Sequence, residues 1–215
     1  PLSNYLKSIH SNSENIKYKR ICLSPLRYAG GKSKAIGLIL ENLPSLPNKK
    51  IVSPFFGGGS LELVLSSQLG FEVIGYDVFQ LLTNFWNELI NNKQSFLSHL
   101  QKLKPTKDDF TRNRHILLHH WEKVKPQDLI YNTKNKLALT DHEKQLLDNN
   151  NTLQAVYYYY NMQLSYGPMF LGWPSSNYIK QKTFDNILKK INNTQFGNLK
   201  VKCSSFEDVI QKHTN

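Results

Sequence analysis

Residues 51–77 read IVSPFFGGGSLELVLSSQLGFEVIGYD. A short apolar run, Ile51–Phe55, leads into three consecutive glycines, and the apolar residues that follow recur at helical spacing. A second β-rich run, Phe71–Tyr76, ends at Asp77. Strand, glycine loop, helix and strand in this order have the content of one βαβ unit, so the stretch predicts parallel strands and an α/β fold.

The glycine loop predicts a site for a nucleoside cofactor. Glycines lack a Cβ, which lets main-chain N–H groups and the following helix approach a ligand closely. A carboxylate about 20 residues further on, at the end of the next strand, is placed to accept hydrogen bonds from both ribose hydroxyls, and Asp77 fits that description. The alternative is a tight turn in an α/β core. The earlier Gly30-Gly31-Lys32 is a weaker signal and is not a phosphate-binding P-loop.

Composition and charge indicate the class of partner. The 215 residues suit one compact domain, or a core domain that carries an insertion. The chain has 27 Lys and Arg against 16 Asp and Glu, a formal net charge of +11 that attracts polyanions. Nucleic acid is therefore the first partner to consider, and a lysine-rich protein without such a partner is the alternative.

Several classes of protein are disfavoured. Cys22 and Cys203 have neither a metal-ligand nor a redox spacing, so we expect no disulfide framework and a reducing, cytoplasmic setting. No apolar run approaches the ~18 residues of a membrane span, so we expect no membrane partner. His115, His119 and His120 have no nearby Cys or acid to complete a metal site, so none is expected.

The remaining patterns give an expected organisation. Residues 1–24 are polar and are expected to form an N-terminal tail or a short helix. We expect the α/β core to comprise residues 25–90 and 196–215, where 199–203 alternates as a strand should. Between them, 91–195 predicts a helical region, within which 152–164 fits helix or strand by composition.

Taken in order, these motifs resemble the Dam-type (alpha-ordered) family of DNA adenine-N6 methyltransferases. The family's opening motif reads close to Trp-Ala-Gly-Gly-Lys, and its first cofactor motif reads close to Glu-Pro-Phe-x-Gly-x-Gly-Ser. The counterparts here are Tyr28-Ala29-Gly30-Gly31-Lys32 and Ser53-Pro54-Phe55-Phe56-Gly57-Gly58-Gly59-Ser60, followed by Asp77. A later Tyr-Gly turn recurs at Tyr166-Gly167. The resemblance extends from about Ser24 to Val209 and is strongest from Pro25 to Asp77.

The resemblance implies a Rossmann-like core that depends on S-adenosylmethionine, with a helical target-recognition insertion. Tyr28 and Lys32 are implied to lie near the methionine moiety, the Phe56–Gly59 loop under the cofactor, Asp77 on the ribose and Phe206 beside the adenine. Phe56 and Phe206 have the alternative of being core aromatics. Tyr28 and Ser53 depart from the family's Trp and Glu. The full set of implied cofactor-binding residues is Tyr28, Ala29, Gly30, Gly31, Lys32, Pro54, Phe55, Phe56, Gly57, Gly59, Ser60, Asp77 and Phe206.

The resemblance also implies methyl transfer to adenine N6 in a short sequence of double-stranded DNA, which requires the target base to leave the stack. The basic region from about 101 to 136 is where family members recognise DNA, and its Lys and Arg side chains would contact phosphates. Arg27 is a candidate for a guanine contact. Arg112, Arg114 and Tyr166 are further DNA-binding candidates, although most such charges belong to a solvated helix face.

One expected motif is absent. The family's catalytic tetrapeptide, Asp-Pro-Pro-Tyr, occurs nowhere in the 215 residues, so we assign no catalytic residue to this chain. We expect the tetrapeptide to lie beyond Asn215 or on a second subunit. The alternatives are a DNA-binding specificity subunit without catalysis and an RNA methyltransferase.

Overall fold

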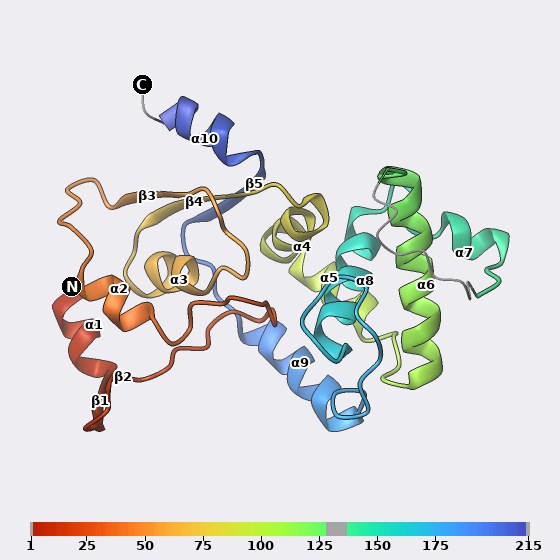
Figure 1. Cartoon of the computed structure of the whole chain (residues 1–215), viewed down its shortest axis with the longest axis horizontal. Helices are drawn as coiled ribbons and strands as arrows, with labels where there is room; N and C mark the ends of the chain where they lie inside the picture. Colours follow the sequence, from red (N-terminus) through yellow and green to blue (C-terminus); the bar gives the residue numbers. More distant parts are fainter. Residues whose placement is uncertain (1, 128–136, 214–215) are drawn as a thin grey trace. The chain divides into compact units, whose positions relative to one another are not determined.

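A computed structural model describes residues 2–127 and 137–213, and the chain divides into two compact units (Figure 1). Unit 1 comprises residues 1–79 and 194–215, and unit 2 comprises 80–193. None of the helices in the described ranges combines the length and apolar character that a membrane span needs.

Unit 1 is built on a parallel sheet. Its strands β3 (Lys50–Ser53), β4 (Glu72–Asp77) and β5 (Leu199–Cys203) pair in the order β3-β4-β5, with Val52 opposite Ile74 and Gly75 opposite Val201. A short helix, α3 (Ser60–Leu63), continues into a π-helical turn, η1 (Val64–Gln68), and connects β3 to β4. The α/β class and the parallel strands predicted from residues 51–77 are confirmed.

The two faces of this sheet are covered by different segments. Because side chains alternate along a strand, Gly75 and Tyr76 face opposite ways. The Phe56 ring fills the space above Gly75, where an added Cβ would lie 2.1 Å from Phe56 Cδ2. On the other face, the Tyr76 hydroxyl lies 3.2 Å from His213 Nε2, at the end of α10 (Phe206–His213). Figure 1 accordingly shows α3 and α10 on opposite sides of the strands.

The first 24 residues are more ordered than the expected tail. They contain α1 (Leu2–Ser8) and a hairpin of β1 (His10–Ser13) and β2 (Ile16–Tyr18), and the next helix is α2 (Ile36–Glu41). Tyr18 is 7% exposed, and its ring lies so close to Gly37 that an added Cβ there would be 2.2 Å from Tyr18 Cγ. This contact makes the segment part of unit 1.

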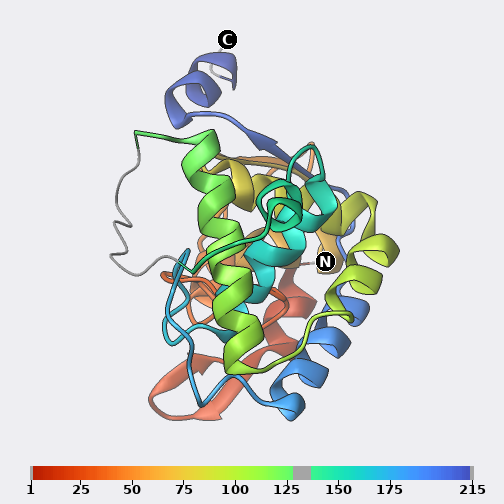
Figure 2. The same ribbon diagram turned by 90° about the vertical axis from the view of Figure 1, so that its right-hand side faces the viewer.

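Unit 2 is helical and is organised around one buried helix (Figure 2). Helix α8 (Asn151–Leu164) packs against α4 (Gln80–Asn91), α5 (Lys93–Leu100) and α6 (Lys107–Val124), and every residue from 155 to 164 is buried. A helix whose side chains are buried on every side needs such a central position. The structure therefore settles 152–164 as helix. The described part of unit 2 also contains the shorter α7 (Asp141–Gln145) and the longer α9 (Gln181–Asn193).

The boundary of unit 2 differs from the expected one at residue 90. Helix α4 belongs to this unit because its aromatic face packs on α8, where the rings of Phe85 and Tyr159 stack 5.1 Å apart. Nearby, the Tyr160 hydroxyl donates a 2.6 Å hydrogen bond to the Lys104 carbonyl. Burial raises the pKa of both tyrosines, so they stay neutral packing groups.

An ion pair between α6 and α7 predicts a pH-dependent stability. The Arg112 guanidinium binds both oxygens of Glu143, with Nη2 2.7 Å from Oε2. This contact, aided by the Thr140 amide, lowers the pKa of Glu143 from 4.5 to about 2. A lowered pKa stabilises the fold above pH 4.5, and the contribution is lost as pH falls towards 2. We expect Glu143→Gln to lower the melting temperature at pH 7, by a margin that shrinks below pH 4.5.

The control for this measurement is Glu14→Gln, at an exposed turn of the β1–β2 hairpin. Thermal melts of the parent and both variants between pH 7 and pH 2.5 make the comparison. A margin between parent and Glu143→Gln that stays constant with pH contradicts the prediction.

Candidate cofactor site

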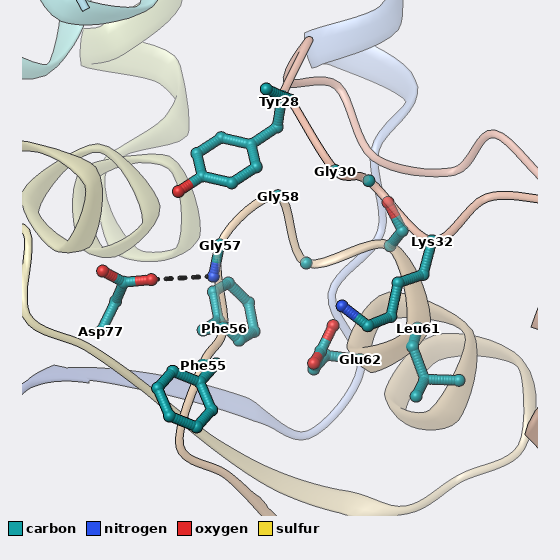
Figure 3. Close-up of a pocket in the computed structure, with 14 residues that line it drawn as sticks. Tyr28, Gly30, Lys32, Phe55, Phe56, Gly57, Gly58, Leu61, Glu62 and Asp77 are labelled. Atoms are coloured by element: carbon teal, nitrogen blue, oxygen red, sulfur yellow. Dashed lines mark hydrogen bonds between the residues drawn. The ribbon is translucent and has the colours of Figure 1, made fainter. Parts of the chain in front are cut away.

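Unit 1 contains a cavity of about 370 Å³ at the carboxyl ends of β3 and β4 (Figure 3). Segments that are distant in sequence meet here, because the 28–32 turn faces the loop that leaves β3, and Asp77 ends β4. The residues that line the cavity are Tyr28, Ala29, Gly30, Gly31, Lys32, Phe55, Phe56, Gly57, Gly58, Gly59, Ser60, Leu61, Glu62 and Asp77. Of the predicted cofactor residues, the structure thus brings eleven together, and Pro54 and Phe206 stand outside the lining.

The glycines let Tyr28 close one wall of the cavity. Gly57 and Gly59 adopt positive φ angles of 52° and 61°, which favour glycine. An added Cβ on Gly57 would lie 2.9 Å from Tyr28 Cε1, and one on Gly58 would lie 2.8 Å from Tyr28 Cβ. Burial, and then the charge of Asp77, raise the pKa of Tyr28, so its hydroxyl remains a neutral donor.

Asp77 links the glycine loop to the end of β4 by a hydrogen bond. Its Oδ2 accepts a 2.9 Å hydrogen bond from the Gly57 amide, and its Oδ1 accepts a 3.0 Å bond from the Phe79 amide. Figure 3 shows the carboxylate beside the loop, on the side of the Tyr28 hydroxyl. Each carboxylate oxygen has a second lone pair, so Asp77 can still accept hydrogen bonds from a ligand.

The three phenylalanines differ in exposure. Phe56 is a core residue, 3% exposed, whose amide donates a 2.8 Å hydrogen bond to the Tyr76 carbonyl, so it offers the cavity mainly its backbone. Phe55 and Phe206 are 67% and 42% exposed, and their rings lie 5.3 Å apart at 33°. Phe206 therefore contacts a lining residue, Phe55, without lining the cavity itself.

Three lining residues, Gly58, Leu61 and Glu62, are absent from the predicted set, although Gly58 lies within the predicted Phe56–Gly59 loop. Glu62 is 8% exposed, and its Oε1 accepts a 2.7 Å hydrogen bond from Ser53 Oγ. Burial raises the pKa of Glu62, and the charge of Lys32 partly opposes this effect. The sequence feature that indicates Glu62 is a carboxylate in the first turn of an otherwise apolar helix, 61–65.

The DNA-binding candidates lie in different settings. Arg27 is half-buried and directly precedes Tyr28 in unit 1. In unit 2, Arg112 binds Glu143, as described above. Arg114 is 2% exposed, its Nε donates a 2.8 Å hydrogen bond to the Leu171 carbonyl, and its guanidinium lies 4.1 Å from the centroid of the Trp173 ring.

Tyr166 is 78% exposed in the segment that follows α8, which suits contact with a partner. Part of the basic region, residues 128–136 with Lys134 and Lys136, lies outside the described residues. Within the described ranges, no three His, Cys, Asp or Glu side chains are grouped to hold a metal ion.

Comparison with known protein families matches residues 28–215 to the D12 class N6 adenine-specific DNA methyltransferases. The match begins at Tyr28 and includes the glycine loop, Asp77 and all of unit 2. The chain belongs to this family. The resemblance inferred from the two glycine motifs is thereby confirmed, and methylation of DNA adenine is the activity that the family implies. A search of curated proteins finds no match.

Proposed function

We propose that this member of the N6 adenine-specific family binds S-adenosylmethionine in the unit 1 cavity and methylates adenine N6 in double-stranded DNA. One observation carries the proposal: in a chain that matches this family over residues 28–215, both glycine segments and Asp77 line a single cavity. The class of reaction comes from the family, and the cavity supplies a place for the methyl donor.

The residues of the cavity fit this cofactor. S-adenosylmethionine supplies an electrophilic methyl group when it is bound. Asp77 has acceptor capacity for the ribose hydroxyls, and Lys32 is a cation that can bind the carboxylate of the methionine moiety. The exposed Phe55–Phe206 pair, whose rings are tilted by 33°, offers aromatic faces on which the adenine can stack. Because Tyr28 lies against Gly57 and Gly58, larger residues at these glycines would displace this wall.

We propose that unit 1 is the Rossmann-like core and that unit 2 is the inserted target-recognition region. The net charge of +11 and the exposed Tyr166 support DNA contact. Arg27 remains a candidate for a base contact, since a guanidinium can bridge two acceptors of guanine. Arg112 and Arg114 would have to leave Glu143 and Leu171 in order to bind DNA, which makes them secondary candidates.

Residues that hold the extruded adenine are proposed to lie outside these 215 residues, because Asp-Pro-Pro-Tyr is absent from them. The source is either sequence beyond Asn215 or a second subunit. The source of these residues can be tested by measuring the transfer of labelled methyl groups to duplex DNA. The measurement compares this chain alone with the assembly purified from its native cells. Transfer by the assembly but not by the chain supports the proposal, and equal transfer by both contradicts it.

DNA binding by the chain should weaken steeply with salt. If Z phosphates are contacted, the logarithm of the association constant falls with the logarithm of salt concentration with a slope of about −0.9Z. We expect a slope of about −4 or steeper for duplex DNA, measured by fluorescence anisotropy, and weaker binding to structured RNA of equal length. A slope near zero, or a preference for the RNA, would contradict the DNA assignment.

A further inference from the structure

Glu62 is a buried carboxylate in the cavity that the family pattern does not account for. That pattern has a glutamate at position 53, where this chain has Ser53. The structure shows Ser53 Oγ donating a 2.7 Å hydrogen bond to Glu62 Oε1. The cavity thus contains a carboxylate from the first turn of α3, and this carboxylate is hydrogen-bonded to the residue at the end of β3 where the family pattern has its glutamate.

A cation faces this carboxylate. Figure 3 shows the Lys32 side chain reaching from the 28–32 turn towards Glu62, and both residues line the cavity. Burial raises the pKa of Glu62. Hydrogen bonds from Ser53 and from the backbone amides of Leu61 and Glu62, together with the charge of Lys32, oppose this effect only in part. The ionised form of such a buried carboxylate is stabilised when a second positive group approaches it, because the attraction compensates the free-energy cost of desolvating the charge.

An α-amino acid group matches this pair of charges. It carries an ammonium and a carboxylate on one carbon, so a cavity with one anion and one cation on facing segments can bind both ends at once. Resting on the proposed function, we propose that Glu62 binds the α-ammonium of the cofactor's methionine moiety while Lys32 binds its carboxylate. Glu62 thereby makes the site selective for ligands that retain the amino-acid end.

The test compares two ligands that share the adenosine half. S-adenosylhomocysteine has the amino-acid end, and 5′-methylthioadenosine lacks it. We expect Glu62→Gln to weaken binding of S-adenosylhomocysteine by about tenfold or more and to leave 5′-methylthioadenosine binding unchanged within about twofold, as measured by calorimetry. Lys32→Gln should likewise weaken binding of S-adenosylhomocysteine and leave binding of 5′-methylthioadenosine unchanged.

Glu72→Gln is the matched control. Glu72 begins β4, at the opposite end of that strand from Asp77, and pairs with Lys50 across 3.6 Å on the surface. The control removes the same charge from the same unit, and both ligands should bind it as they bind the parent chain.

A melting curve separates ligand recognition from a purely structural role. Because burial disfavours the ionised form of Glu62, the neutral amide should keep the melting temperature within about 2 °C of the parent. Unchanged S-adenosylhomocysteine binding by Glu62→Gln overturns the inference, and so does equal weakening of both ligands together with a lower melting temperature. If the parent chain binds neither ligand, the proposed function itself fails.

Discussion

Replacing Asp77 by asparagine is expected to weaken binding of S-adenosylhomocysteine by about 100-fold, because the two proposed hydrogen bonds to the ribose hydroxyls lose the negative charge that strengthens them. The variant also disturbs the loop. The carboxylate accepts bonds from the Gly57 and Phe79 amides with different oxygens, and an amide side chain has only one oxygen to offer. One of the two backbone donors then loses its acceptor, so the melting temperature should fall slightly. Calorimetric titration measures the affinity.

Asp185→Asn is the control for this substitution. Asp185 is exposed on α9 and accepts a 2.8 Å hydrogen bond from Gln181 within the same helix. Its replacement should leave the affinity for S-adenosylhomocysteine unchanged. An Asp77→Asn variant that binds within about threefold of the parent would remove Asp77 from the cofactor site.

The substitution Gly75→Ala is expected to give the largest loss of stability. The new Cβ would lie 2.1 Å from Phe56 Cδ2, and Phe56 has little room to move, because its ring is buried and its amide is bonded to Tyr76. Overpacking of this kind costs about 1–3 kcal/mol, which lowers the melting temperature of a chain this size by roughly 3–10 °C. The shift of Phe56 should also weaken cofactor binding, since its neighbours Phe55 and Gly57 line the cavity.

A double variant tests whether the clash with Phe56 causes the loss of stability. If the clash with Phe56 is responsible, Gly75→Ala combined with Phe56→Ala should be less destabilised than the sum of the two single variants. Gly167→Ala is the control, because an added Cβ there meets nothing closer than Met169 at 3.9 Å. Additive effects of the two unit 1 substitutions would contradict the packing argument.

The α/β core could be predicted because its signals are local. The strand, glycine loop and helix of 51–69 follow from neighbouring residues, and the spacing of Asp77 after the glycines predicts that it joins the same site. Helix α8 could not be distinguished from a strand, because its composition, with four consecutive tyrosines, fits either. Its helical conformation depends on packing partners that are distant in the sequence. Phe85, for example, stacks on the ring of Tyr159 and lies 74 positions before it in the chain (159 − 85).

The remaining differences arise from contacts that link distant positions. The order of residues 2–18 depends on the approach of Tyr18 to Gly37. Arg112 and Arg114 stay candidates for DNA contact, but the sequence does not show that they bind Glu143 and Leu171, which lie 31 and 57 residues further along. Glu62 was overlooked because its carboxylate enters the cavity through the geometry of α3, which no motif in the sequence describes.

The proposed function requires the cofactor to bind in the unit 1 cavity, and an NMR titration with ¹⁵N-glycine labelling tests this placement most directly. The chain has 11 glycines, of which Gly30, Gly31, Gly57, Gly58 and Gly59 line the cavity. On addition of S-adenosylhomocysteine, we expect the amide signals of these five to shift and saturate together, while those of Gly167 and Gly172 in unit 2 stay in place. A spectrum without shifts at saturating ligand, or with shifts confined to other glycines, would contradict the account.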